Sequence, residues 1–166
     1  YNLPIRSESE RGEGAMVILI AGASRTGKTL LAQKLMERYG YPVLSIDLLK
    51  MGLIRSGMCP LTPESTDEAL TAVLWPVVRE IVKTAVENGQ SLTVEGCYIP
   101  FNWREDFDAS CLPHIRFLCL VFSEAYIRTR FDTIQTHANA IERRKDDSFC
   151  TMELLLAENR RNLEAC

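Results

Sequence analysis

The sequence has few of the residues that build metal centres and disulfide frameworks. It contains two histidines, and its six cysteines form no CxxC pair and have no histidine at metal-ligand spacing. Such scattered cysteines favour the reduced thiols of a cytosolic protein over a disulfide scaffold. They are Cys59, Cys97, Cys111, Cys119, Cys150 and Cys166.

Long apolar runs and a positive net charge are also lacking. No stretch approaches the roughly 20 apolar residues that span a bilayer, and the first 15 residues carry Glu and Arg where a signal peptide has an apolar core. The formal net charge is −3, so no broad basic field attracts a nucleic acid. We therefore expect a cytoplasmic protein that binds neither membranes nor nucleic acids.

Composition and pattern together predict one α/β domain. The chain has 166 residues, of which 46% are hydrophobic, and this suits a single compact core. We predict a polar N-terminal tail over residues 1–15 and a domain over residues 16–166. Apolar runs alternate with helical patterns, which favours a mainly parallel sheet with helices on both faces. The expected strands are 16–22, 41–47, 91–99 and 115–122.

Turn and cap residues mark the expected helices. The first helix begins at Gly27 and ends at Gly40. Thr62 followed by Pro63 predicts the start of a second, which carries a long apolar stripe as far as Asn88 and is expected to kink at Pro76. Further helical patterns cover residues 124–134 and 149–165.

The sharpest motif is "GASRTGKT", which follows the first apolar run. It fits GxxxxGK[ST] at every required letter and stands between a predicted buried strand and a predicted helix, which is the context that this motif needs. The alternative is an ordinary glycine-containing turn with a solvated lysine. The letters and their context together strongly favour a phosphate-binding turn.

Each letter of the motif has a physical task. The two glycines allow the backbone to turn its N–H groups inward, and the helix that starts near Gly27 directs its unpaired amides at an anion. Lys28 is expected to reach the β- and γ-phosphates of a nucleotide, and the hydroxyl of Thr29 to bind Mg²⁺. The residues predicted to bind the nucleotide in this stretch are Gly22, Ala23, Ser24, Arg25, Thr26, Gly27, Lys28, Thr29 and Leu30.

Two carboxylates follow the next predicted strands, at the edge where α/β sheets bind ligands. Asp47 is a candidate general base for an acceptor hydroxyl, and its alternative role is to cap the helix that follows. Glu95 is a candidate ligand of the Mg²⁺ shell, or the base if Asp47 is not. The sequence leaves the choice between these two carboxylates open.

Four arginines after the last strand are candidates for stabilising transition-state charge. The guanidinium group matches phosphate oxygens in geometry. Arg128 and Arg130 are predicted as catalytic residues, and Arg144, which follows Arg143, is predicted to bind the nucleotide. They bracket a polar stretch, 128–148, that we interpret as a lid. For each arginine alone, a solvated charged face is an equally good explanation.

These features resemble the P-loop NTPases, and among them the small adenylate-kinase-like nucleoside and nucleotide kinases. Beside the glycine-rich turn, "LSIDLLK" is similar to their "GDLLR" segment and "LTVEGCYI" to their "hhhDG" segment. "SEAYIRTRF" is similar to the segment that leads into their mobile lid. The resemblance implies a three-layer α/β/α fold with strand order 2-3-1-4, ATP and Mg²⁺ as cofactors, and transfer of the γ-phosphoryl group to a small-molecule or nucleotide acceptor.

Two departures from that family limit what the resemblance implies. An adenylate kinase has an arginine shortly after the strand-three glycine, whereas "GCYIPFNWR" reaches its first arginine at Arg104, which puts AMP as the acceptor in doubt. Tyr98, Phe101 and Trp103 suggest aromatic walls instead, although packing is the more common role of such a tryptophan. The sequence also ends at Cys166, before the fifth strand that these kinases usually add. An ATP-binding regulatory module without turnover remains the alternative to a kinase.

Overall fold

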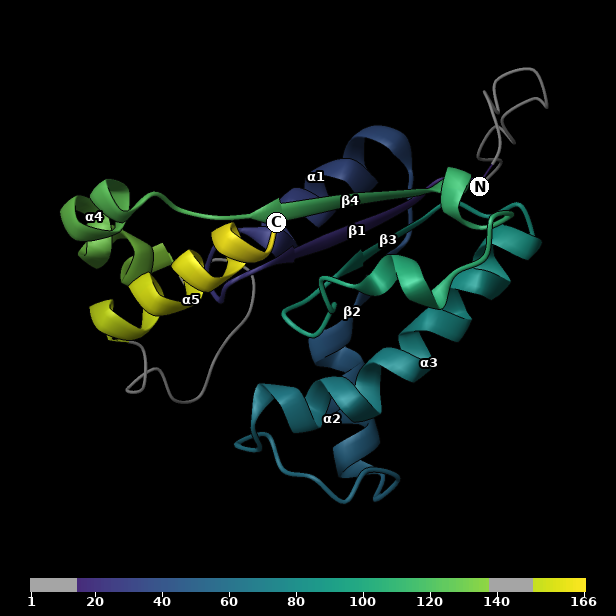
Figure 1. The fold of residues 1–166 in the computed structure, drawn as a ribbon, viewed down its shortest axis with the longest axis horizontal. Helices are drawn as coiled ribbons and strands as arrows, with labels where there is room; N and C mark the ends of the chain where they lie inside the picture. Colours follow the sequence, from purple (N-terminus) through teal and green to yellow (C-terminus); the bar gives the residue numbers. More distant parts are fainter. Residues whose placement is uncertain (1–14, 138–150) are drawn as a thin grey trace, which may run out of the picture.

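The computed structural model describes residues 15–137 and 151–166 (Figure 1). Four strands form one parallel sheet in the order β2-β3-β1-β4, which confirms the expected fold class and strand order. The strands are β1 (Val17–Gly22), β2 (Val43–Ser45), β3 (Leu92–Glu95) and β4 (Ile115–Leu120). The helices are α1 (Lys28–Tyr39), α2 (Ile46–Arg55), α3 (Asp67–Glu87), α4 (Glu124–His137) and α5 (Met152–Ala165). Nearly all of the predicted tail, and residues 138–148 of the predicted lid, lie outside the described part of the chain.

Helices cover both faces of the sheet, as expected. Successive residues of a strand point to opposite faces. Val94 of β3 packs in the cluster that α2 and α3 share with the sheet, whereas Glu95, its neighbour, contacts Thr29 of α1. The helix α1 therefore lies on one face, with α2 and α3 on the other. Val17, Leu19 and Ala21 of β1 alternate toward the α3 side in the same way.

The strands β2 and β3 are shorter than the apolar runs predicted. β2 ends at Ser45, and α2 begins at once with Ile46, so Asp47 lies in the first turn of a helix and not at the end of a strand. β3 ends at Glu95, where Gly96 lets the chain pass α2: a Cβ atom on Gly96 would lie 2.8 Å from Cβ of Ile46. Close packing of α2 on the sheet thus ends both strands early.

The helix α3 begins four residues later than Thr62 and Pro63 predicted. Thr66 is its N-cap, and its hydroxyl accepts a hydrogen bond from the backbone N–H of Ala69 at 3.3 Å. Thr62 is held instead in a turn by a hydrogen bond from its own N–H to Oγ of Ser65. Beyond the cap, one helix continues through Pro76 to Glu87.

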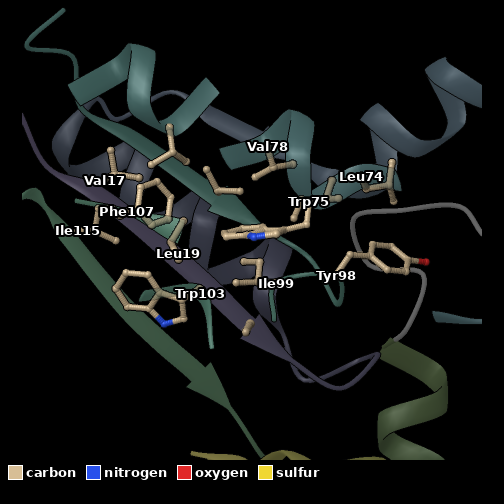
Figure 2. Packing of buried hydrophobic residues seen from close by; sticks show 14 of the residues in the cluster. Val17, Leu19, Leu74, Trp75, Val78, Tyr98, Ile99, Trp103, Phe107 and Ile115 are labelled. Atoms are coloured by element: carbon tan, nitrogen blue, oxygen red, sulfur yellow. The ribbon is translucent and has the colours of Figure 1, made fainter. Parts of the chain in front are cut away.

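The core between the sheet and α3 contains both tryptophans (Figure 2). Trp103 is 2% exposed and packs edge-on against Phe107 and stacked on Phe117. It is therefore a core residue, and its suggested role as a wall of an acceptor site is wrong. Arg104 lies over the outer part of this tryptophan, with its guanidinium carbon 4.7 Å from the ring centroid.

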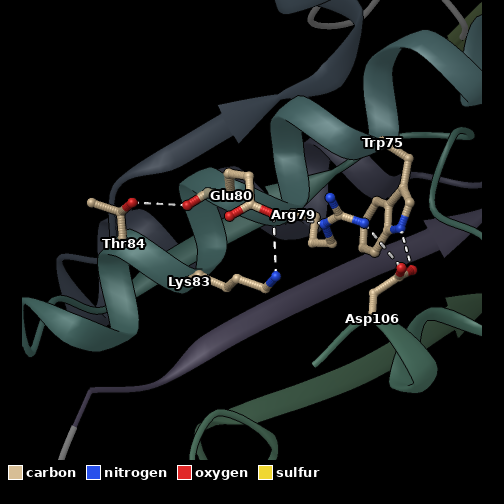
Figure 3. A network of polar contacts seen from close by, with 6 residues as sticks. All are labelled: Trp75, Arg79, Glu80, Lys83, Thr84 and Asp106. Carbon is tan, nitrogen blue, oxygen red and sulfur yellow. Dashed lines mark hydrogen bonds and ion pairs between the residues drawn. The ribbon is translucent and has the colours of Figure 1, made fainter. Parts of the chain in front are cut away.

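A polar network fixes α3 to the loop after β3 (Figure 3). The carboxylate of Asp106 accepts a hydrogen bond from the indole N–H of Trp75 at 2.7 Å and one from Arg79 at 3.2 Å. The indole N–H of a buried tryptophan needs an acceptor, and Asp106 supplies it from a short 3₁₀ helix. The segment from Tyr98 onward is held against α3 in this way.

Candidate functional site

The β1–α1 turn, residues 22–29, has the backbone that the glycine-rich motif predicts. Gly22 adopts a positive φ of 135°, and a Cβ atom there would collide with the backbone carbonyl of Leu120. Gly27, with φ of 89°, is the N-cap of α1, and even Arg25 lies in the left-handed region with φ of 67°. The first turn of α1, from Lys28 to Leu30, therefore starts directly at the turn with amides that have no partner in the helix.

Lys28 is folded back into this turn. It is 6% exposed, and its ammonium group donates a hydrogen bond of 2.7 Å to the backbone carbonyl of Ala23. The hydroxyl of Thr26 donates to the same carbonyl at 2.8 Å. A buried ammonium group on a neutral acceptor keeps its charge available to an anion.

Thr29 and Glu95, both predicted as metal ligands, lie together. The hydroxyl of Thr29 donates to Glu95 across a distance of 3.3 Å, and Glu95 is 1% exposed. In the sheet, Glu95 is in register with Ile20 of β1 and Ser45 of β2. It is the last residue of β3, and its side chain lies on the face of the sheet that α1 covers. A hydroxyl beside a carboxylate is a donor set that suits Mg²⁺, which completes its shell with water and phosphate oxygens.

Among the residues that the structure describes, no group of three or more His, Cys, Asp and Glu side chains stands together as a metal site.

Asp47 is held by Lys50, which is bound in turn to Tyr98. Lys50 donates hydrogen bonds of 2.7 Å to the carboxylate of Asp47 and of 2.8 Å to the hydroxyl of Tyr98. The side chain of Lys50 is 12% exposed and that of Asp47 is 29% exposed. Ser45, and not Asp47, is the N-cap of α2, so the predicted capping alternative is wrong.

The partners in this cluster shift each other's protonation. Burial lowers the pKa of Lys50, but the carboxylate of Asp47 and the hydroxyl of Tyr98 raise it more, so that it lies above its ordinary value. Burial raises the pKa of Tyr98, against the ammonium group of Lys50, which lowers it. Lys50 therefore stays charged and Tyr98 stays protonated at neutral pH.

Cys97 lies between the turn and the Asp47 cluster. Burial raises the pKa of the Cys97 thiol, and the charge of Lys28 acts in the opposite direction. The charge of Asp47 raises this pKa as well, so groups of both regions act on the one thiol.

The predicted arginines of α4 lie on its exposed surface. Arg128 is exposed and pairs with Glu124, one turn before it on α4, at 2.7 Å. Arg130 is exposed too, and its backbone breaks the helical pattern of α4 with φ of −128°. Arg143 and Arg144 lie outside the described residues. The structure thus pairs Arg128 within its own helix and does not bring it to the β1–α1 turn.

The sequence did not point to Glu158 of α5, a carboxylate whose pKa responds to groups of the turn. The backbone N–H of Ser24 and the positive charge of Lys28 both lower this pKa. Burial first, and then the charge of Asp67, raise the pKa of Glu158 against these two partners. Glu158 lies in α5, more than 120 positions after the turn, among other charged residues. No sequence motif near the turn could therefore have indicated it.

No helix within the described ranges is both long and apolar enough to cross a membrane. No family model matches the sequence, and no curated protein matches it. Solved structures do match the fold.

One similar structure is a provisionally assigned kinase from Chloroflexus aurantiacus, with a TM-score of 0.60 and 20% identity over 89% of this chain and 80% of that one. A chain of the Pnkp1/Rnl/Hen1 RNA repair complex has a TM-score of 0.58 and 12% identity over 97% of this chain, which spans 49% of that chain. TT1252 from Thermus thermophilus has a TM-score of 0.50 and 19% identity over 92% of this chain and 84% of that one. At these identities the likeness is one of fold: an α/β fold with a four-stranded parallel sheet that this chain shares with a kinase-like protein.

Proposed function

We propose that this protein is an ATP-dependent phosphotransferase, which transfers the γ-phosphoryl group of Mg-ATP to a small-molecule or nucleotide acceptor. The observation that carries the proposal is the contact of Thr29 with Glu95 beside the buried ammonium group of Lys28. These groups supply a metal-binding pair and a cation next to the unpaired amides of a helix start. A kinase-like neighbour with the same fold adds support at a coarse level.

The residues of the turn would bind the phosphates. Lys28 would exchange the carbonyl of Ala23 for phosphate oxygens, and the amides from Gly27 to Leu30 would donate to the same anion. Thr29 and Glu95 would hold Mg²⁺, which offsets phosphate charge when it is bound. Catalysis by such a site rests on positioning and electrostatics.

Burial separates the roles of the two carboxylates. Glu95 is nearly inaccessible and already engages Thr29, which suits the metal shell. Asp47 is more exposed, so an acceptor hydroxyl can reach it. We assign the base to Asp47, with Lys50 and Tyr98 as positioning residues that fix the direction of its carboxylate.

The predicted arginines of α4 and the following segment remain candidates for closing over the phosphates. Arg128 would have to leave Glu124 to do so. Such an exchange costs little, because an exposed ion pair contributes little to stability. Arg130 and Arg144 are proposed for the same role.

The test is an ADP-release screen with Mg-ATP over nucleosides, nucleotides, sugars, phospho-acids and aminoglycoside-like alcohols. Asp47→Asn is expected to lower acceptor-dependent ADP release by about 10²–10⁴-fold, the usual contribution of a general base. Glu37→Gln is the matched control, because Glu37 is also paired with a lysine three positions away, on the exposed face of α1. If ATP binds but no acceptor raises ADP release above slow hydrolysis, the protein is an ATP-binding module without turnover.

A further inference from the structure

The hydroxyl of Ser45 is a buried polar group that the fold itself does not use. Ser45 is 7% exposed, and its Oγ atom has no hydrogen-bond partner within the described part of the chain. Serine is a favoured N-cap because its hydroxyl accepts a backbone N–H of the helix that follows. Ser45 is the N-cap of α2, yet its side chain forms no such bond. Since a buried hydroxyl without a partner destabilises a fold, its presence here indicates a role outside the cap.

The sheet places this hydroxyl beside the pair of Thr29 and Glu95. Ser45 is the last residue of β2 and is in parallel register with Glu95 of β3. Registered residues of neighbouring strands point to the same face of a sheet, and the strands lie about 4.8 Å apart. Glu95 points to the α1 face, where the hydroxyl of Thr29 donates to it across 3.3 Å. Ser45, Glu95 and Thr29 therefore lie on one face, at the carboxyl ends of β2 and β3.

Thr93 of β3 is an internal comparison for Ser45. Its hydroxyl is likewise buried and without a hydrogen-bond partner among residues 15–137 and 151–166, and Thr93 is 0% exposed. Thr93 precedes Glu95 by two residues, so it shares its face but lies about 6.6 Å further from the carboxyl end of the strand. Its register partners are the hydrocarbon side chains of Ile18 and Val43. Thr93 thus has the burial of Ser45 but no carboxylate in register with it.

Resting on the proposed function, we infer that Ser45 is a positioning residue of the Mg²⁺ site, whose hydroxyl shares a water ligand of the ion with Glu95. Mg²⁺ binds through one or two carboxylates and keeps several of its waters. A hydroxyl that lies beside a carboxylate without a direct bond to it can share a water molecule with it. Residues that orient metal ligands in this way contribute to metal affinity without touching the ion. Metal binding then gives Ser45 the partner that the fold does not supply.

The test is calorimetric titration with AMP-PNP, a non-hydrolysable analogue of ATP, in excess Mg²⁺ and again in EDTA. Ser45→Ala should weaken binding in Mg²⁺ about tenfold, as expected for a residue that orients metal ligands. In EDTA the affinity of Ser45→Ala should stay within about twofold of the parent, because no metal is then bound. Equal losses in Mg²⁺ and in EDTA, or no loss in either, would overturn the inference.

Thr93→Val is the matched control for the loss of a buried hydroxyl. It keeps the shape of the side chain and removes the other hydroxyl that has no partner in the described ranges. Its affinity for AMP-PNP should stay within about twofold of the parent in Mg²⁺ and in EDTA, because Thr93 orients no metal ligand. A loss confined to Mg²⁺ in Thr93→Val as large as that in Ser45→Ala would overturn the inference, because the effect would then not depend on the place beside Glu95.

Urea unfolding of the ligand-free protein separates the proposed role from a structural one. Ser45→Ala and Thr93→Val each remove a buried hydroxyl that has no partner among the described residues, so neither should lower the urea midpoint. A lower midpoint in Ser45→Ala, together with an unchanged effect of Mg²⁺ on AMP-PNP binding, would make Ser45 a cap of α2 and overturn the inference.

Glu95→Gln distinguishes failure of this inference from failure of the proposed function. If Mg²⁺ strengthens AMP-PNP binding equally in the parent and in Ser45→Ala, but not in Glu95→Gln, the metal site stands and Ser45 does not contribute to it. If Mg²⁺ strengthens binding in the parent, and less in both variants, Ser45 and Glu95 act on the same ion. If Mg²⁺ has no effect on the parent, the metal site and the role of Ser45 are both overturned.

Discussion

Two nearly buried lysines at the carboxyl edge of the sheet are held in opposite ways. Lys28, in the β1–α1 turn, donates to the neutral carbonyl of Ala23 at 2.7 Å. Lys50, on α2, donates at the same distance to the carboxylate of Asp47. A neutral partner satisfies the hydrogen bond and leaves the charge for a ligand, whereas a carboxylate partner neutralises it.

The comparison assigns different tasks to the two regions. The β1–α1 turn holds Lys28 on a neutral partner, and the carboxylate of Glu95 lies beside its Thr29. The Asp47 cluster is balanced within itself, and the second hydrogen bond of Lys50, to Tyr98, adds direction to the pair. We expect the first region to determine phosphate affinity and the second to determine turnover.

Lys28→Met should have the largest effect, and this effect is on Mg-ATP affinity. The substitution keeps the length of the side chain and removes its charge, so Mg-ATP affinity should fall about a hundredfold. The free energy of unfolding should not fall, because a buried ammonium group on a neutral acceptor adds little stability. Calorimetric titration and thermal melting measure the two quantities, with Lys34→Met on the exposed face of α1 as control. Unchanged ATP affinity would remove the phosphate role of the turn.

Lys50→Met should have the next largest effect, on acceptor-dependent ADP release and not on Mg-ATP affinity. Acceptor-dependent ADP release should fall about tenfold, as expected when a general base loses its orientation, while Mg-ATP affinity stays within about twofold. In the Asp47→Asn background, Lys50→Met should have no further effect, because a positioning residue acts only through its partner. Equal losses in both backgrounds would show that Lys50 acts on the substrate by itself.

The region around Lys28 was the more predictable of the two from the sequence. Its features are local: the apolar run, the glycines at Gly22 and Gly27, and the lysine follow one another, so chain geometry alone brings them together. The sheet order followed from the family resemblance, and the meeting of Thr29 with Glu95 followed from the rule that ligands bind at the carboxyl ends of parallel strands. The structure confirms that order.

The region around Lys50 depends on packing between segments that are distant in the sequence. Motifs and local sequence patterns do not predict such packing. Asp47 was expected at a strand end, but α2 packs so closely on the sheet at Gly96 that β2 stops at Ser45. Tyr98 contacts Lys50 across 48 positions, and Asn159 of α5 contacts Phe122 across 37. Packing was the more common of the two roles weighed for Trp103, and its burial places it in the core.

The smallest expected effect is on the free energy of unfolding. It compares the ion pair of the Asp47 cluster with an ion pair on the surface. Lys50 with Asp47 and Lys34 with Glu37 are both pairs three positions apart in a helix, but the Lys34 side chain is 66% exposed and that of Lys50 is 12% exposed. Lys50→Met should lower the free energy of unfolding by about 1 kcal/mol, because it leaves Asp47 partly buried without its partner. Lys34→Met should not change the midpoint of urea unfolding measurably.

The pH dependence of this difference in unfolding free energy shows whether it comes from the charge of Lys50. The pKa of Lys50 in the folded protein lies above its ordinary value, because Asp47 and Tyr98 outweigh the effect of burial. A raised pKa contributes stability that is complete below the unfolded value, about 10.4 for lysine, and is lost as the pH rises through the folded value. The difference between the parent and Lys50→Met should therefore be full at pH 8 and shrink above pH ~10.5. A difference that persists at high pH would mean that Lys50 stabilises α2 by packing of its aliphatic stem, and not through the charge on which the positioning of Asp47 depends.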